Sequence, residues 1–213
     1  MADTTLVLAT RSAHKAREIA RIVAPLGLAV ETLADLGVGP SPAEDGIEVH
    51  DTFRDNAVAK ARYFASRLGR TAVADDSGLR VDALGGEPGV HTKRFSGRSD
   101  LEGQALDDAN NALLLDELGD VPEERRGARY VCVAAIAWPD GRAFAAVGTV
   151  SGRIGTAPRG TGGFGYDPLF HVPELDARFA EVPPDVKNAM SHRSRAFRAL
   201  AAALESSPWT PDG

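Results

Sequence analysis

Apolar and polar positions in the first third of the chain follow two spacings, which predict strands separated by helices. The apolar runs at residues 5–9 and 28–32 are typical of buried strands, and a helix is expected between them over residues 13–24. Gly and Pro interrupt residues 33–50, which indicates a loop. A second helix is expected up to residue 68, because its apolar residues form one stripe at helical spacing: Phe53, Ala57, Ala61, Phe64 and Leu68.

The rest of the pattern adds a helix, a hairpin and a final helix. Residues 101–118 have helical periodicity, and the runs 128–138 and 142–150 flank Pro139-Asp140-Gly141, a typical hairpin turn. Residues 151–185 are rich in Gly and Pro. Ser191 is expected to cap a last helix, whose apolar face contains Phe197, Leu200, Ala201 and Leu204. Because helices and strands alternate early and a hairpin follows, we expect an α/β fold with a mixed sheet.

Composition narrows the class of protein. The 213 residues suffice for a single domain, expected over 1–213 with a frayed tail at about 206–213. The net charge of -6 argues against a broad nucleic-acid-binding face but allows a small phosphorylated ligand, which needs only a few local cations. No apolar run reaches the ~18 residues of a membrane helix, so no membrane partner is expected. The N-terminus lacks the features of a signal peptide.

Cys132 is the single cysteine and lies in an apolar run. We expect a core thiol rather than a nucleophile, because nothing near it in the sequence would lower its pKa. One cysteine cannot form a disulfide within the chain, which agrees with a cytoplasmic location.

Residues 71–97 are the most informative segment. An apolar run ends in Asp75-Asp76, a turn is expected at Ser77-Gly78, and alternation resumes at Leu79. Two adjacent carboxylates at the end of a buried strand are costly unless a metal or another cation meets them. Successive strand residues face opposite ways, so only one of the two can point into a given site. A solvated turn is the alternative interpretation of this motif alone.

Two further segments place cations and an acid near helix starts. In LATRSAHK, Thr10, Ser12 and Lys15 surround a helix N-terminus, which favours phosphate; a simple Ser cap with an exposed Lys is the alternative. Before and on the second helix lie Glu48, Asn56 and Lys60, and the last two share one helix face because they are four residues apart; a solvated face is the alternative here.

The run RGTGGFGYDPLF matches a dinucleotide-binding fingerprint only in its glycines. Such a fingerprint needs a strand before it and a helix after it, whereas Pro158 precedes the glycines and Tyr166-Asp167-Pro168 follow them. We therefore expect a flexible loop that presents Phe164 and Tyr166 beside Asp167. Each aromatic ring could stack on a flat ligand or instead plug the loop onto the core.

The segment KNAMSHRSRAF places His192 and Arg193 in the first turn of the last helix, where cations oppose the helix dipole. Such a turn is best tolerated when an anion binds there. Lys187 and Asn188 are expected to precede it in a turn. A basic surface helix is the alternative interpretation.

Together these segments resemble the inosine/xanthosine triphosphate pyrophosphatase family of nucleotide hydrolases. The matching pieces are spread over residues 6–197 in the family's order: LATRSAHKAREI, TFRDNAVAKA, ADDSGLRVDALGGEPGV, GTGGFGYDPLF and KNAMSHRSRA. Any one piece is a weak signal, whereas five in register are specific. The chain departs from the family where Arg11-Ser12 replace a common Gly-Asn, and where Val49-His50 follow Glu48 in place of Thr-Gly.

The resemblance implies an elongated mixed sheet with flanking helices in two lobes, and an active cleft between the lobes. It also implies a cytoplasmic homodimer that uses Mg²⁺ to hydrolyse ITP, dITP and XTP to the monophosphate and pyrophosphate. Carried over, Glu48 and Asp76 would hold the metal, and Asp76 would also accept the proton of the attacking water. The substrate would be bound by the remaining matched residues: Thr10, Arg11, Ser12, Ala13, His14, Lys15 and Lys60 around the phosphates, Ser77, and Phe164, Gly165, Tyr166, Asp167, Lys187, His192 and Arg193 around the base.

Two other functions remain open at this point. One is a pyrophosphatase that prefers other modified nucleotides, such as pyrimidine triphosphates. The other is a non-catalytic purine-nucleotide sensor on the same fold. Intact Glu48, Asp76 and Lys15 argue against the sensor, which has no need of a metal-and-water apparatus.

Overall fold

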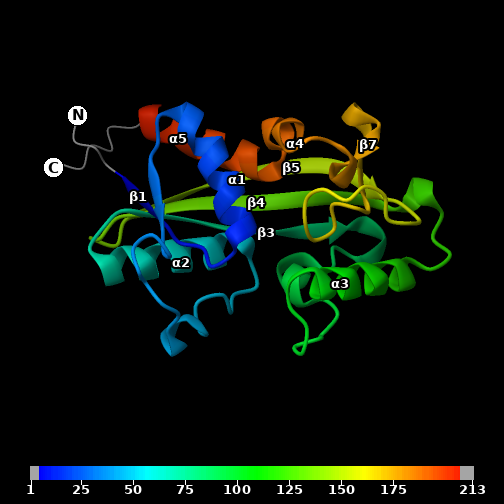
Figure 1. Cartoon of the computed structure of the whole chain (residues 1–213), viewed down its shortest axis with the longest axis horizontal. Coiled ribbons are helices and arrows are strands. Elements are labelled where there is room, and N and C mark those ends of the chain that lie inside the picture. The colour runs from blue at the N-terminus through cyan, green and yellow to red at the C-terminus, as the bar shows by residue number, and fades with distance from the viewer. Residues whose placement is uncertain (1–4, 207–213) are drawn as a thin grey trace. The chain divides into compact units, whose positions relative to one another are not determined.

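The computed structural model describes residues 5–206, and its helices and strands alternate along most of that length (Figure 1). In chain order, the main elements are β1 (Leu6–Leu8), α1 (Ala13–Val23), β2 (Val30–Thr32), α2 (Phe53–Leu68), β3 (Ala72–Val81), α3 (Gly103–Leu118), β4 (Gly127–Ala137), β5 (Ala143–Ile154), β6 (Phe170–Val172), β7 (Ala177–Arg178), α4 (Pro184–Met190) and α5 (His192–Ser206). The frayed tail expected from about residue 206 lies, beyond Ser206, outside the described residues. No helix among residues 5–206 is long and apolar enough to cross a membrane.

The strands form one seven-stranded sheet in the order β2-β1-β3-β4-β5-β6-β7. β1 pairs in parallel with both β2 and β3, whereas β6 pairs antiparallel with both β5 and β7. This combination confirms the prediction of a mixed α/β sheet.

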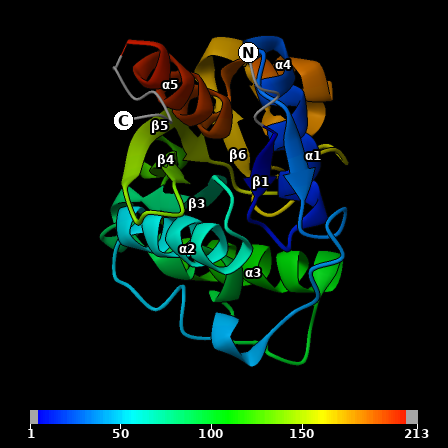
Figure 2. The ribbon, with the colours of Figure 1, turned by 90° about the vertical axis from the view of Figure 1, so that its left-hand side faces the viewer.

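The chain divides into two compact units, and β3, β4 and β5 each contribute to both. The first unit contains the described residues up to Asp76, residues 132–148 and those from Arg193 onward. Successive residues of β1 supply two separate cores because they face opposite ways. Leu6 and Leu8 pack with α1 and α5, while Val7 packs with α2. Figure 2 shows α1 and α5 on one face of the strands of this unit and α2 on the other.

The second unit contains residues 77–131 and 149–192. Its core joins the second half of β3 to α3 through Leu79, Val81, Leu114 and Leu118, and includes Phe170 of β6. Gly152 in β5 permits close packing there, because an added Cβ would lie 2.3 Å from the carbonyl oxygen of His171.

Two local predictions were wrong. The expected turn at Ser77-Gly78 is absent, and β3 continues through it, because residues 77–79 are buried and paired in the sheet. Lys187 and Asn188 lie in helix α4 rather than in a turn, and Pro184 supplies a favourable first helical residue. Ser191 lies between α4 and α5 with an extended backbone.

Candidate functional site

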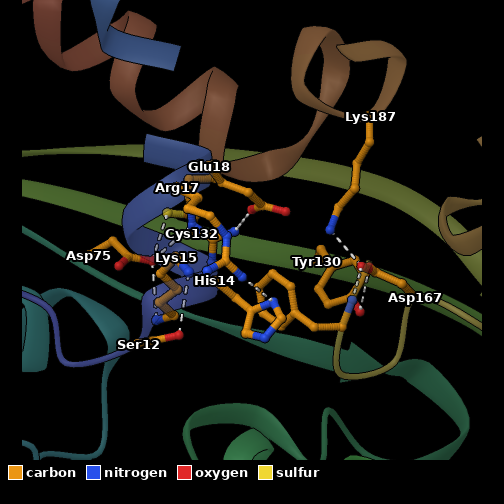
Figure 3. Close-up of polar contacts among 12 residues, drawn as sticks. Ser12, His14, Lys15, Arg17, Glu18, Asp75, Tyr130, Cys132, Asp167 and Lys187 are labelled. Atoms are coloured by element: carbon orange, nitrogen blue, oxygen red, sulfur yellow. Dashed lines mark hydrogen bonds and ion pairs between the residues drawn. The ribbon is translucent and has the colours of Figure 1, made fainter. Parts of the chain in front are cut away.

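Asp75 is a fully buried carboxylate in β3 that is held by two cations. Its Oδ2 lies 3.2 Å from Lys15 Nζ and 3.3 Å from Arg193 Nε; Figure 3 shows the contact with Lys15. Burial alone would raise the pKa of Asp75, but the charges of Lys15, Arg193 and Lys60 hold it well below its ordinary value of 3.8. Asp75 is therefore an ionised anchor for cations, an arrangement that two neighbouring Asp residues alone did not reveal.

Arg193 lies in the first turn of α5 and is only 1% exposed. Its guanidinium forms ion pairs with Asp75 and with Glu18 of α1. These two carboxylates raise the pKa of Arg193, although burial acts in the opposite direction. The anion expected at the start of the last helix is thus supplied, in this structure, by side chains of the protein itself. Sequence reasoning missed Glu18, although it lies one helical turn after Lys15.

Asp76 points the other way from Asp75 and is only partly buried. Its Oδ2 accepts a hydrogen bond from Asn56 Nδ2 at 3.0 Å. Burial raises the pKa of Asp76, and Glu48 adds to this effect, while Lys15, Lys60 and the Asn56 hydrogen bond oppose it without cancelling it. The two adjacent aspartates consequently have pKa values shifted in opposite directions.

Asn56 joins Asp76 to the loop that carries Glu48. Besides its bond to Asp76, the side chain accepts the His50 N–H at 2.9 Å and donates to the His50 carbonyl at 3.2 Å. Its exposed fraction is only 2%. A buried amide with three such bonds fixes the approach of the loop to β3.

Glu48 is half-exposed and forms an ion pair with Lys60 of α2. Burial would lower the pKa of Lys60, but Glu48, Asp75 and Asp76 together raise it. Carboxylate oxygens from Glu48 and Asp76, both near Lys60, suit a hard divalent cation. Residues 5–206 contain no cluster of three His, Cys, Asp or Glu side chains that could hold a metal. Two carboxylates nevertheless fit Mg²⁺, which commonly takes one or two from the protein and completes its shell with water and substrate phosphates.

The start of α1 is capped as its sequence predicted. Thr10 Oγ1 accepts the Ser12 N–H at 3.2 Å, and Ser12 Oγ accepts the Lys15 N–H at 3.3 Å. The Arg11 side chain turns to the following loop, where its guanidinium lies 2.7 Å from Glu44 and donates to the Gly39 carbonyl at 2.8 Å. The helix N-terminus and Lys15 thus remain the elements suited to phosphate, and Arg11 acts in this structure as a brace for the loop.

In the second unit, several of the residues that were predicted to bind the substrate contact Asp167. Its Oδ2 lies 2.5 Å from Lys187 Nζ and accepts the Phe164 N–H at 2.9 Å; Figure 3 shows Lys187 reaching toward it. Lys187 Nζ also lies 4.7 Å from the centre of the Phe164 ring. Tyr130 donates its hydroxyl to Asp167 Oδ1 at 3.4 Å.

The remaining aromatic contacts show which rings are anchors. The His192 ring stacks on Tyr130 with centroids 4.6 Å apart. Tyr166 is only 4% exposed, and its hydroxyl donates to the Thr92 carbonyl at 2.8 Å. Of the two interpretations of this loop, Tyr166 therefore fits the plug, whereas Phe164 is partly exposed, as a ring that stacks on a ligand must be.

The free N–H groups at the start of α1, with Lys15 beside them, suit an anionic group such as phosphate. The chain matches the model of the Ham1 family over residues 6–203 and belongs to that family. This confirms the resemblance predicted from the five sequence segments.

Relatives and a solved structure agree with this assignment. The chain is 47% identical over 203 residues to a dITP/XTP pyrophosphatase of Thermus thermophilus, covering 95% of this chain and 93% of that protein. It is 49% identical over 199 residues to one from Frankia alni, covering 93% and 96%. The solved HAM1 protein from Coxiella burnetii matches with a TM-score of 0.80 and 32% identity, covering 95% of this chain and 99% of the other.

Proposed function

We propose that this chain hydrolyses the non-standard purine nucleoside triphosphates dITP, ITP and XTP to the monophosphate and pyrophosphate. The observation that carries the proposal is the division of the Asp pair: Asp75 anchors two cations, while the adjacent Asp76 is only partly buried and has a raised pKa. The relatives of this chain that are named dITP/XTP pyrophosphatase support the choice of substrate.

In the first unit, the N-terminus of α1 and Lys15 bind phosphate oxygens, and Lys60 adds a second cation. Asp76 accepts the proton from the water that attacks the α-phosphorus, a role that suits a carboxylate with a raised pKa. Glu48 and Asp76 would hold Mg²⁺, which when bound neutralises charge on the triphosphate.

In the second unit, Phe164 stacks on the purine and Lys187 donates to its 6-oxo group. Lys187 already contacts Asp167, but an ammonium has three N–H donors and can serve both acceptors. Adenine carries a 6-amino donor instead, so it offers Lys187 no acceptor on the base, and only the contact with Asp167 remains. His192, stacked on Tyr130, completes this group, and Arg193 acts in the first unit by holding Asp75.

The test is pyrophosphate release from ITP, XTP, dITP, GTP and ATP, with Mg²⁺ and with EDTA. We expect fast, metal-dependent release from the first three only, and its loss in Asp76→Asn. Equal rates on all five would contradict the assignment of Lys187 to recognition of the purine. A much higher rate with dUTP than with ITP would indicate another modified nucleotide as the substrate. Tight binding of ITP without turnover would indicate a sensor.

We further infer a cytoplasmic homodimer, as the family resemblance implies. Sedimentation of the purified chain tests the assembly, and a mass of about 22 kDa in place of twice that value would exclude it.

A further inference from the structure

Helix α3 carries two side chains that hold one residue, Gly165, of the loop bearing Phe164. The Gly165 N–H donates to Asp107 Oδ2 at 2.7 Å, and the Gly165 carbonyl accepts from Asn111 Nδ2 at 3.0 Å. Asp107 and Asn111 are four residues apart, so they share one face of α3. Both hydrogen-bonding groups of Gly165, the residue next to Phe164, are therefore bound by a single helix face.

The loop needs such support because its own backbone is permissive. Gly160, Gly163 and Gly165 have positive φ angles of 79°, 73° and 62°, and glycine has more conformational freedom to lose than any other residue. The loop is also tied to the segment after β7, where Gly162 donates to the Ala180 carbonyl at 3.0 Å. The contacts from α3 hold Gly165, which is the residue next to Phe164.

Asn111 is a polar side chain in a largely buried position of α3. The side chain is only 8% exposed, and its Oδ1 has no hydrogen-bond partner among the residues that the structure describes. Burying a polar amide costs free energy unless it is hydrogen-bonded. The bond from Asn111 Nδ2 to Gly165 is the gain that offsets this cost.

We propose that Asp107 and Asn111 are positioning residues that set the orientation of Phe164 and thereby the affinity for the purine. The proposal rests on the proposed function, because it assigns Phe164 to base stacking. The bond to Asp107 is charge-assisted and is the stronger of the two. Loss of either should act on substrate binding more than on the chemical step, which is assigned to residues of the first unit.

The experiment compares Asp107→Ala and Asn111→Leu with the parent in three measurements: hydrogen exchange of the amides in residues 160–167, kcat and KM for ITP, and thermal unfolding. Alanine preserves the helix. We expect faster exchange in this peptide and a KM raised about tenfold, with kcat within threefold of the parent. Asp107→Asn should restore most of the KM, because its amide oxygen can still accept the Gly165 N–H.

Asp108→Ala is the matched control, since Asp108 is exposed on the same helix and contacts Gln104 at 2.8 Å. It should leave exchange and KM unchanged. Unchanged exchange in both test variants would overturn the proposal, as would a fall in kcat at constant KM, which signals loss of folded enzyme. If the parent hydrolyses no triphosphate, the proposed function fails. The exchange measurement needs no substrate and would still decide whether α3 holds this loop.

Discussion

Replacing Asp75 by Asn should destabilise the fold, because it removes a charge from a site that two cations share. The side chain is fully buried, with Oδ2 3.2 Å from Lys15 Nζ and 3.3 Å from Arg193 Nε. Asparagine keeps the shape of aspartate but supplies no negative charge. Arg193 would then remain buried and would keep its ion pair with Glu18.

The magnitude follows from what each cation can do afterwards. Breaking a buried ion pair by removing one partner costs about 3–5 kcal/mol. The Lys15 side chain is 20% exposed and can turn toward water, and Glu18 retains part of the attraction for Arg193, so the lower end applies. At roughly 2–4 °C per kcal/mol for a chain of this length, a loss of about 3 kcal/mol lowers Tm by about 6–12 °C.

The pH dependence of stability gives an independent check. The pKa of Asp75 is lower in the folded protein than its ordinary value of 3.8. Its contribution is therefore present above that value and is lost as the pH falls below it. The parent should lose stability in this acidic window more steeply than Asp75→Asn, which has no such group to protonate.

Thermal unfolding followed by circular dichroism, at neutral and acidic pH, measures both effects. Asp140→Asn is the control, because Asp140 pairs with Arg142 at 2.6 Å on the exposed turn between β4 and β5. Its Tm should stay at the parent value. An Asp75→Asn variant within about 2 °C of the parent at neutral pH would refute the claim that the buried carboxylate balances buried cations.

Three further substitutions have expected outcomes. Tyr166→Phe removes the donor to the partly buried Thr92 carbonyl and should cost about 1 kcal/mol in denaturant unfolding, while kcat for ITP is kept. A large loss of kcat would give Tyr166 a direct role. Asn56→Leu removes a hydrogen-bond donor that lowers the pKa of Asp76. The acidic limb of the pH profile of kcat/KM should therefore move to higher pH. If this limb did not move, Asp76 would be excluded as the titrating base. Lys60→Met should lower kcat/KM for ITP by about a hundredfold, whereas Arg62→Met on the same helix should not.

Local signals in the sequence predicted those elements whose boundaries are set locally. The α2 helix ends at Leu68 as expected, because Gly69 follows with a φ of 60°, and it begins after Thr52, whose side chain accepts the Asp55 N–H. Its apolar stripe lies in the core as predicted, with Ala57, Ala61 and Phe64 buried. In such elements the N-cap residue, the spacing of apolar residues and the terminating glycine all indicate the same helix.

The wrong prediction at Ser77-Gly78 concerns a segment that is determined by distant parts of the chain. Ser77-Gly78 has the composition of a turn, but sheet pairing continues the strand through it. The partners of Asp75 were not predictable for the same reason: Lys15 and Arg193 lie 60 positions before it and 118 after it. Residue types suited to the chemistry could be recognised, while the pairs they form required the fold.

Strand geometry explains how two identical neighbouring residues come to have different roles. Because successive side chains of β3 face opposite ways, Asp75 enters the layer shared with Lys15 and Arg193, and Asp76 faces Asn56 and the loop of Glu48. One position therefore stabilises the fold through its charge, and the other leaves a carboxylate accessible for chemistry. It follows that Asp75→Asn should lower Tm whether or not substrate is present, whereas Asp76→Asn should abolish pyrophosphate release with Tm nearly unchanged. If the two variants lost stability and activity in parallel, this division of roles between neighbouring aspartates would be wrong.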